Sequence, residues 1–442
     1  MTKHPHVVAP LRERWKSERG VSLIMVAVEI LMLTGFTVFV LDYGVMWLGR
    51  RQAQNAADAA ALAGAISRAY DEPVDPPPPT GTSYQAAVAA ANVNQVFGET
   101  GGVAVEFECP AFAAGFRCVR ADVHRDGADV DGDGATDSNP LPTFFGQIWG
   151  ITTQNVRATA TAWVAYGNTT NCMRPFSVVD KWNDLVNPAL NPKKFERWQK
   201  VGPNLVQLNP KDIYSPPNST STGTGYTPAL DLGTQVFLKR GNPSGSADNV
   251  EPGWSLPVQL PDPAGGYFQG ANDYNWSIKH CIGAPVSIGD YLPTETGVMQ
   301  GPTKQGVDLD ADSLIKQDQN AVWVSSPAPG HISGSCVPTC GSFSPRIVPI
   351  SLFDADEYQW RVTANDWTHE WIPNVGPGPG AFSCPIGGRC VRVTNILGFF
   401  IESVTNGGDV TGRIMMLPGE LLTGASSVAP GASFVTNIQL IR

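Results

Sequence analysis

The chain has 442 residues, of which 42% are hydrophobic and only 16% are charged, and its formal net charge at pH 7 is −10. This negative charge argues against nucleic acid as a partner, because binding to phosphates requires clustered Lys and Arg. The 46 Gly and 37 Pro residues argue against a mostly helical protein and favour an all-β or α+β body rich in turns.

An apolar segment, residues 21–48, is the first element that the sequence predicts. Between Val21 and Leu41 its only charged residue is Glu29, and it contains no proline. A bilayer core about 30 Å thick needs about 20 helical residues at ~1.5 Å each, so the segment is long enough to span a membrane. A cleaved signal peptide has a shorter apolar region, of about 7–15 residues. We therefore expect the segment to be retained as a signal anchor.

The charges on the two sides of this segment predict its orientation. Lys and Arg are frequent in residues 1–20, whereas only Arg50 and Arg51 follow the segment closely. Short flanks rich in Lys and Arg stay in the cytoplasm. We therefore predict a single-pass protein of the cytoplasmic membrane, with residues 1–20 as a cytoplasmic basic arm and the bulk of the chain extracytoplasmic.

The chain contains eight cysteines, and all of them follow the membrane segment. An even number of cysteines in an exported region indicates disulfides. Their spacing suggests the pairs Cys109–Cys118, Cys172–Cys281, Cys336–Cys340 and Cys384–Cys390, although eight cysteines allow roughly a hundred connectivities. A zinc site made by the last four cysteines is the alternative, but their spacing fits the usual zinc pairs poorly.

The alanine-rich stretch after the membrane segment extends the predicted helix. Residues 50–70 contain strong helix formers and no proline, so we expect one continuous helix from residue 21 to about residue 70. Ala56, Ala60 and Ala63 form a narrow stripe of small side chains, which lets another helix or a sheet approach closely. The alternative is a simple spacer that packs against nothing.

Two acidic residues, Glu29 and Asp42, belong to the predicted membrane helix. A carboxylate in hydrocarbon is costly, so such a residue usually pairs with another group or stays protonated. Both are therefore candidate contacts with a partner of the membrane helix, such as an N-terminal amine or a basic side chain. The alternative for Glu29 is a protonated or snorkelling side chain that has no partner.

A recognisable order of motifs runs through this region: a Gly preceded by Arg, the apolar span, an Asp near its outer end, and the arginine-led stretch QNAADAAALAGA. This order resembles the N-terminal segment of Tad-type (Flp pilus assembly) proteins of the TadE/TadG group. Residues 140–164, which include TFFGQIWGI, resemble the second half of the same module. The resemblance implies a pilus-assembly or minor pilus-associated protein whose partners are the membrane and other pilus-assembly or pilin-like proteins.

Two features found in related proteins are missing. Processing after Gly20 by a prepilin peptidase requires Glu at the fifth residue of the mature chain, and this chain has Met25 there. The Asp-x-Ser-x-Ser motif that begins the metal site of a von Willebrand A-type domain is also absent. We therefore expect neither prepilin-type processing nor a von Willebrand A-type domain.

Residues 49–166 predict an α+β module. A proline-rich break at residues 73–82 follows the long helix, and a second alanine-rich helix begins near Ser83, which caps it. Strand-like runs with alternating apolar and polar residues then continue to Tyr166. A long helix, a second helix and antiparallel strands in this order predict a pilin-like module.

An acidic loop inside this module is a candidate calcium site. Asp129, Asp131, Asp133 and Asp137 occupy the first, third, fifth and ninth positions of a calcium loop, but Pro140 stands where the bidentate Glu would be. Carboxylates at alternate positions repel one another unless a cation lies among them. Calcium is therefore a candidate cofactor with weak affinity, and the alternative is a solvated acidic turn.

The remaining residues, 172–442, contain strand-like runs separated by Gly- and Pro-rich turn signals, and they predict a second, mostly β domain. The predicted fold class is therefore α+β. An N-terminal transmembrane helix continues into a pilin-like α+β module, and a mostly β extracytoplasmic domain follows.

We find no catalytic motif in the sequence: neither a His-Glu-x-x-His zinc motif, nor a Gly-x-Ser-x-Gly elbow, nor a P-loop. His369 and Glu370 lie between Trp367 and Trp371, a cluster that binds a glycan or a partner, or else forms an ordinary core edge. We therefore predict a non-enzymatic assembly protein. The alternatives are a surface adhesin or glycan-binding protein on the same membrane anchor, and an exported hydrolase.

Overall fold

The computed structural model describes residues 14–72, 77–78, 80–111, 116–128, 138–186, 188–189, 193–245 and 250–441. The chain divides into two compact units, which we describe separately. The first unit comprises Met1–Ser67, Pro76–Trp163 and Leu440–Arg442, and the second comprises Arg68–Asp75 and Val164–Gln439. The division falls within a helix and within two strands, so the chain passes between the units through regular structure.

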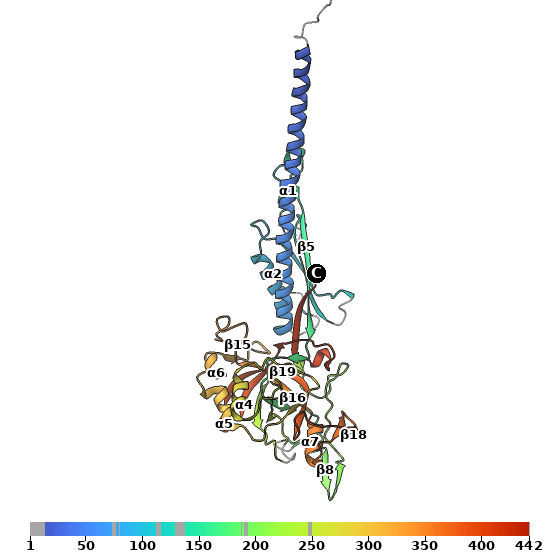
Figure 1. Ribbon diagram of the computed structural model, residues 1–442, viewed down its shortest axis with the longest axis vertical. Coiled ribbons are helices and arrows are strands. Elements are labelled where there is room, and N and C mark those ends of the chain that lie inside the picture. The colour runs from blue at the N-terminus through green and yellow to red at the C-terminus, as the bar shows by residue number, and fades with distance from the viewer. Residues whose placement is uncertain are drawn as a thin grey trace, which may run out of the picture. The chain divides into compact units, whose positions relative to one another are not determined.

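The long N-terminal helix α1 (Arg14–Tyr70) is a single uninterrupted helix of 57 residues (Figure 1). It begins seven residues before the predicted start at Val21, because nothing in the sequence after Arg14 breaks a helix. The most apolar part of α1 is not buried against any other part of the structure. This exposure and the length of α1 are compatible with a single-pass membrane anchor.

The rest of the first unit consists of one helix and a small sheet. Its elements are α2 (Thr82–Val93), β1 (Gly102–Glu106), β2 (Arg117–Arg125), β3 (Leu141–Pro142), the 3₁₀ helix η2 (Gly146–Trp149), β4 (Thr153–Gln154) and β5 (Val156–Tyr166). β2 lies between β1 and β5, and β1 pairs antiparallel with β2. β3 and β4 form a separate short antiparallel hairpin. The predicted combination of helices and antiparallel strands is therefore present.

The second unit is built around a closed sheet. Its strands are β7 (Phe176–Val179), β10 (Gln235–Arg240), β11 (Trp254–Pro257), β13 (Tyr291–Pro293), β16 (Ile347–Phe353), β19 (Cys390–Val404) and β20 (Val410–Met415). They follow the order β13-β19-β16-β7-β11-β10-β20, and β19 also pairs with β20, which closes the sheet into a barrel. β16 and β19 are labelled in Figure 1. The prediction of a mostly β C-terminal region is confirmed.

Short elements complete the second unit. The strands are β6 (Thr169–Thr170), β8 (Trp198–Val201), β9 (Asn204–Gln207), β12 (Val286–Ser287), β14 (Val322–Val324), β15 (His331–Ser333), β17 (His369–Ile372), β18 (Gly376–Ala381), β21 (Leu417–Pro418) and β22 (Val435–Ile441). The helices are α3 (Pro228–Asp231), α4 (Gly270–Lys279), α5 (Gln300–Lys304), η4 (Gln305–Leu309), α6 (Leu314–Gln317), α7 (Ala355–Ala364) and η5 (Pro430–Ala432).

Alternation of side chains along the barrel strands explains the core of the second unit. On β16, Val348, Ile350 and Leu352 belong to one buried cluster, to which β19 adds Leu397 and Phe399. Successive strand residues point to opposite faces, so these residues share a face of the sheet. Burying an aliphatic or aromatic side chain of this size contributes ~1.5–3 kcal/mol, and the cluster therefore supplies much of the stability of the unit.

Four disulfides connect the eight cysteines in the predicted pairs: Cys109–Cys118, Cys172–Cys281, Cys336–Cys340 and Cys384–Cys390. The predicted connectivity is therefore confirmed. The alternative of a zinc site made by the last four cysteines is wrong, because their thiolates are consumed in two separate bridges. Disulfides persist in oxidising compartments, so they support an extracytoplasmic location of the bulk of the chain.

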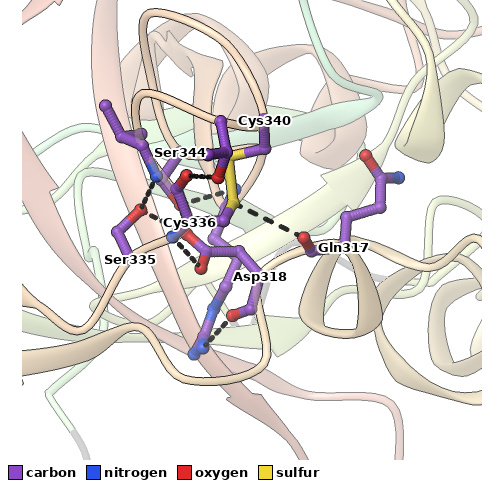
Figure 2. Close-up of a disulfide and its surroundings, with 9 residues drawn as sticks. Gln317, Asp318, Ser335, Cys336, Cys340 and Ser344 are labelled. Carbon is purple, nitrogen blue, oxygen red and sulfur yellow. Dashed lines mark hydrogen bonds between the residues drawn. A yellow bond between two sulfur atoms is a disulfide. The ribbon is translucent and has the colours of Figure 1, made fainter.

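The buried carboxylate of Asp318 binds several groups of the chain next to the Cys336–Cys340 disulfide. Figure 2 shows Asp318 beside the Cys336–Cys340 disulfide, where it accepts hydrogen bonds from the Cys336 amide and from the hydroxyls of Ser335 and Ser344. Burial alone would raise the pKa of Asp318, but these hydrogen bonds outweigh it and hold the pKa below its usual range. Asp318 therefore fixes the loop that the disulfide closes.

Candidate functional site

Asp42 of α1 holds a loop of its own unit. Its Oδ1 accepts a hydrogen bond from the Phe144 amide at 2.9 Å, and its Oδ2 accepts one from the Gly146 amide at 2.6 Å. The Phe145 amide lies 3.2 Å from Oδ2. These three amides stand at the start of η2, where backbone N–H groups have no partner within the helix. The sequence assigned Asp42 to a partner of the membrane helix, and the structure shows both of its oxygens used within the first unit.

The loop that Asp42 holds comprises residues 143–152, and we call it the clamp loop. The Thr143 amide donates to the Thr152 carbonyl at 3.1 Å, and the Ile151 amide donates to the Gly146 carbonyl at 3.0 Å. A Cβ atom at Gly146 would lie 3.0 Å from the Ile151 carbonyl oxygen, so a larger residue would push the two sides of the loop apart. The clamp loop is thus a closed turn fixed to α1.

Glu29 is exposed on the apolar part of α1. Among the residues that the structure describes, no hydrogen bond or ion pair is found for its side chain. Glu29 therefore keeps its predicted role as a candidate contact, and the alternative of a side chain without a partner stays open.

The alanine stripe packs inside the first unit. Ala56 and Ala60 are fully buried, and Ala63 is half-buried. One residue further along α1, a Cβ atom at Gly64 would lie 2.7 Å from Val119 of β2 and 3.1 Å from the Cβ of Ala87 of α2. The small side chains thus allow the unit's own sheet and second helix to approach α1 closely. A spacer that packs against nothing would leave this face exposed.

Polar side chains of α1 add fixed contacts that sequence reasoning did not assign. Gln52 accepts a hydrogen bond from the Phe97 amide at 2.9 Å, and Gln54 donates to the Thr159 carbonyl of β5 at 3.3 Å. The two glutamines are visible in the sequence as polar residues within the alanine-rich stretch. Their partners could not be identified there, because they lie 45 and 105 residues away. α1 is therefore held at several points along its length.

The candidate calcium ligands Asp129, Asp131, Asp133 and Asp137 lie outside the described residues. Within the described part of the chain, no group of three or more His, Cys, Asp or Glu side chains is placed to hold a metal ion. The calcium site therefore stays a prediction.

The tryptophan cluster near α7 lies at the edge of a core. Trp371 is buried against Trp360, with ring centroids 5.6 Å apart, and Trp367 packs against Tyr358. Trp371 is therefore not accessible to a sugar and Trp367 is half-buried, whereas the neighbouring His369 and Glu370 are exposed. The arrangement fits the core-edge alternative.

A cavity of about 600 Å³ in the second unit is lined by residues that include Asp180, Trp182 and Asp184. Burial raises the pKa of Asp180 to about 6, although the carboxylate accepts hydrogen bonds from two amides and from the Tyr214 hydroxyl. Asp184 lies 3.5 Å from the Lys193 ammonium group. Both carboxylates are thus engaged by neighbouring groups of the same unit.

Further buried acids lie at the N-cap and in the first turn of α7, and each is paired with an arginine. The contacts are Asp354–Arg392 at 2.9 Å, Asp356–Arg197 at 2.8 Å and Glu357–Arg361 at 2.8 Å. Truncating one partner of such a pair leaves an uncompensated buried charge. The network therefore positions α7 on the barrel.

Comparison with known protein families gives a match, and it falls on α1. No curated protein and no solved structure matches the chain significantly, so the likeness to a pilin stays a prediction. Residues 20–68, which lie within α1, match the family described as putative Flp pilus-assembly TadE/G-like, and the Tad-type resemblance of the N-terminal region is thereby confirmed.

Proposed function

We propose that this protein is a membrane-anchored component of a Tad-type pilus machine, acting in assembly or as a minor pilus-associated protein. The observation that carries the proposal is the coincidence of the family match, residues 20–68, with a helix whose apolar part has no covering partner in the described structure. The N-terminus lies in the cytoplasm and the bulk of the chain after the apolar part of α1 lies outside it, as the flanking charges and the disulfides favour.

The mechanism is helix packing and surface recognition. The alanine face of α1 is occupied by the protein's own strands and α2, so contacts with other membrane helices fall to the exposed apolar part that carries Glu29. Small and polar residues drive helix association in lipid, where apolar side chains gain little from leaving the lipid tails. A partner that offers Glu29 a positive charge or a donor gains an interaction in a medium of low dielectric.

The proposed role is not catalytic. The paired acids of the α7 network and the two carboxylates of the 600 Å³ cavity support this. Each of them forms an ion pair with a basic side chain or, in the case of Asp180, accepts hydrogen bonds from neighbouring groups. A general acid or base must lie within hydrogen-bond reach of the proton that it transfers.

The test is piliation and partner capture in a strain that lacks the protein. The strain is complemented with the wild type, with Glu29→Leu, or with Met32→Leu as a matched control on the exposed apolar part. We expect complementation to restore pili, and the detergent-extracted wild type to co-purify with pilus-assembly proteins. Normal piliation in the strain that lacks the protein would refute the proposal. Loss of capture by Glu29→Leu alone would place the partner contact at Glu29.

One observation favours a second candidate function, a ligand-binding module on the same anchor. Trp182 and Lys181 line the 600 Å³ cavity beside Asp184, a combination of aromatic and polar groups that suits a glycan. Glycan-array binding by the full-length protein in detergent, reduced by Trp182→Ala, would favour this function. Absence of binding together with lost piliation in the deletion strain would favour assembly.

A further inference from the structure

The clamp loop presents apolar side chains outward. Phe144, Ile148, Trp149 and Ile151 are each between 58% and 65% exposed. The sequence contains no charged residue from Ser138 to Val156. A monomeric soluble protein rarely exposes a contiguous apolar surface of this kind without a partner that covers it.

The attachment to Asp42 sets the depth of the clamp loop along α1. Asp42 follows Val21 by 21 residues, which corresponds to about 31 Å of helix. The hydrocarbon core of a bilayer is about 30 Å thick. If the apolar segment enters the core at Val21, it therefore leaves the core near Asp42, and the clamp loop lies at the same level as the outer edge of the hydrocarbon.

Most backbone N–H groups of the clamp loop have a hydrogen-bond acceptor within the first unit, as a medium with little water requires. Backbone groups without partners are costly there, so a loop can approach lipid only when its N–H groups are satisfied. Hydrogen bonds to acceptors within the first unit satisfy the amides of Thr143, Phe144, Phe145, Gly146, Ile148, Gly150 and Ile151. The Gln147 side chain also donates within the loop, to the Thr143 carbonyl at 2.7 Å.

The neighbouring turns of α1 carry side chains typical of a membrane interface. Tyr43 and Trp47 are about half-exposed, and the Arg51 guanidinium lies 4.1 Å from the centre of the Trp47 ring. Tyr and Trp concentrate at the boundary between hydrocarbon and headgroups, and an Arg just outside the boundary reaches the phosphates. Trp149 of the clamp loop adds a further aromatic ring to this level.

We propose that the clamp loop is a second membrane contact, which inserts Phe144, Ile148, Trp149 and Ile151 into the interface of the outer leaflet beside α1. The occupant of this apolar surface is the lipid bilayer itself. The inference rests on the membrane anchoring in the proposed function. It adds that the first unit is seated on the membrane by two elements and that Asp42 joins them.

Site-directed spin labelling of the full-length protein in vesicles of phosphatidylethanolamine and phosphatidylglycerol tests the inference. All eight native cysteines are in disulfides, so an introduced cysteine is the single free thiol for a nitroxide. The labelled variants are Ile148→Cys and Ile151→Cys in the clamp loop, Leu33→Cys in the apolar span, and Ile66→Cys as an aqueous control. Ile66 is half-exposed and follows Asp42 by 24 residues, which places it about 36 Å further along α1.

We expect the labels at Ile148 and Ile151 to collide more with oxygen than with a water-soluble nickel complex, as at Leu33, and the label at Ile66 to show the reverse. A further change, Phe144→Ser with Trp149→Ser, should shift the Ile148 label toward the aqueous response. A lipid response at Leu33 with an aqueous response at Ile148 would overturn the loop proposal and leave the anchor intact. If the label at Ile148 collided with neither oxygen nor the nickel complex, the loop would be covered by protein, and this result would also overturn the loop proposal. An aqueous response at Leu33 would instead refute the anchor on which the proposed function depends.

Discussion

Replacing Ala60 with Leu tests whether the alanine face of α1 packs inside the first unit. Ala60 is fully buried, and the tight approach of β2 and α2 one turn later, at Gly64, shows how little room this face leaves. A leucine adds three carbon atoms to a site without a cavity, and such overpacking typically costs about 1–3 kcal/mol. Helix propensity contributes almost nothing to the difference, because Ala and Leu are both good helix formers.

The assay is thermal unfolding of the full-length protein in detergent, with limited proteolysis of the first unit as a second measurement. For a unit of ~150 residues, 1 kcal/mol lowers Tm by about 2–4 °C, so we expect Ala60→Leu to lower Tm by about 2–12 °C. Ala59→Leu is the matched control, because Ala59 lies on the same helix and is only half-buried. An equal decrease of Tm in both variants would refute the reasoning. Unchanged stability of Ala60→Leu with lost partner capture would show that this face binds another protein.

Three further predictions concern single groups. Asp42→Ala should speed hydrogen exchange of the Phe144 and Gly146 amides, because three amides lose their acceptor and the buried one, that of Gly146, loses about 1–3 kcal/mol. Unchanged exchange would contradict the contact between Asp42 and the clamp loop. Burial raises the pKa of Asp180 from its ordinary 3.8 to about 6, so the folded state binds the proton more tightly. The contribution of Asp180 to stability should therefore fall by ~3 kcal/mol as pH rises from about 4 to about 6, and Asp180→Asn should lessen the pH dependence of Tm by this amount. Mass spectrometry of the non-reduced protein should find the four bridges, and four or more free thiols would reject them.

The local features of the fold could be predicted from the sequence, and those that join distant segments could not. The uninterrupted helix follows from the absence of proline between Arg14 and Tyr70, and three of the disulfides close loops with sequence separations of 9, 4 and 6 residues. Closure of the barrel depends on β19 pairing with both β16 and β20, and alternation along one strand does not reveal its neighbours.

The contact of Asp42 with the clamp loop shows where sequence reasoning stopped. The Asp and the TFFGQIWGI stretch were both visible as motifs, but more than 100 residues separate them. A buried carboxylate needs donors, and the sequence offered a partner protein as readily as the chain's own amides. Only the fold places the start of η2 beside α1, which converts a predicted intermolecular contact into an intramolecular one.

The way in which the first unit holds α1 also determines which side of the membrane helix is open to a partner. Successive residues of an α-helix are rotated by about 100°. On this basis Glu29 is rotated by about 140° from Asp42 and by about 180° from Ala56 around the axis of α1. The hydrogen bonds of Asp42 hold the clamp loop on one side of α1, so Glu29 lies about 140° around the helix axis from the side that this loop covers. A partner helix can therefore approach Glu29 without displacing the clamp loop, and its binding need not cost the first unit any of its packing.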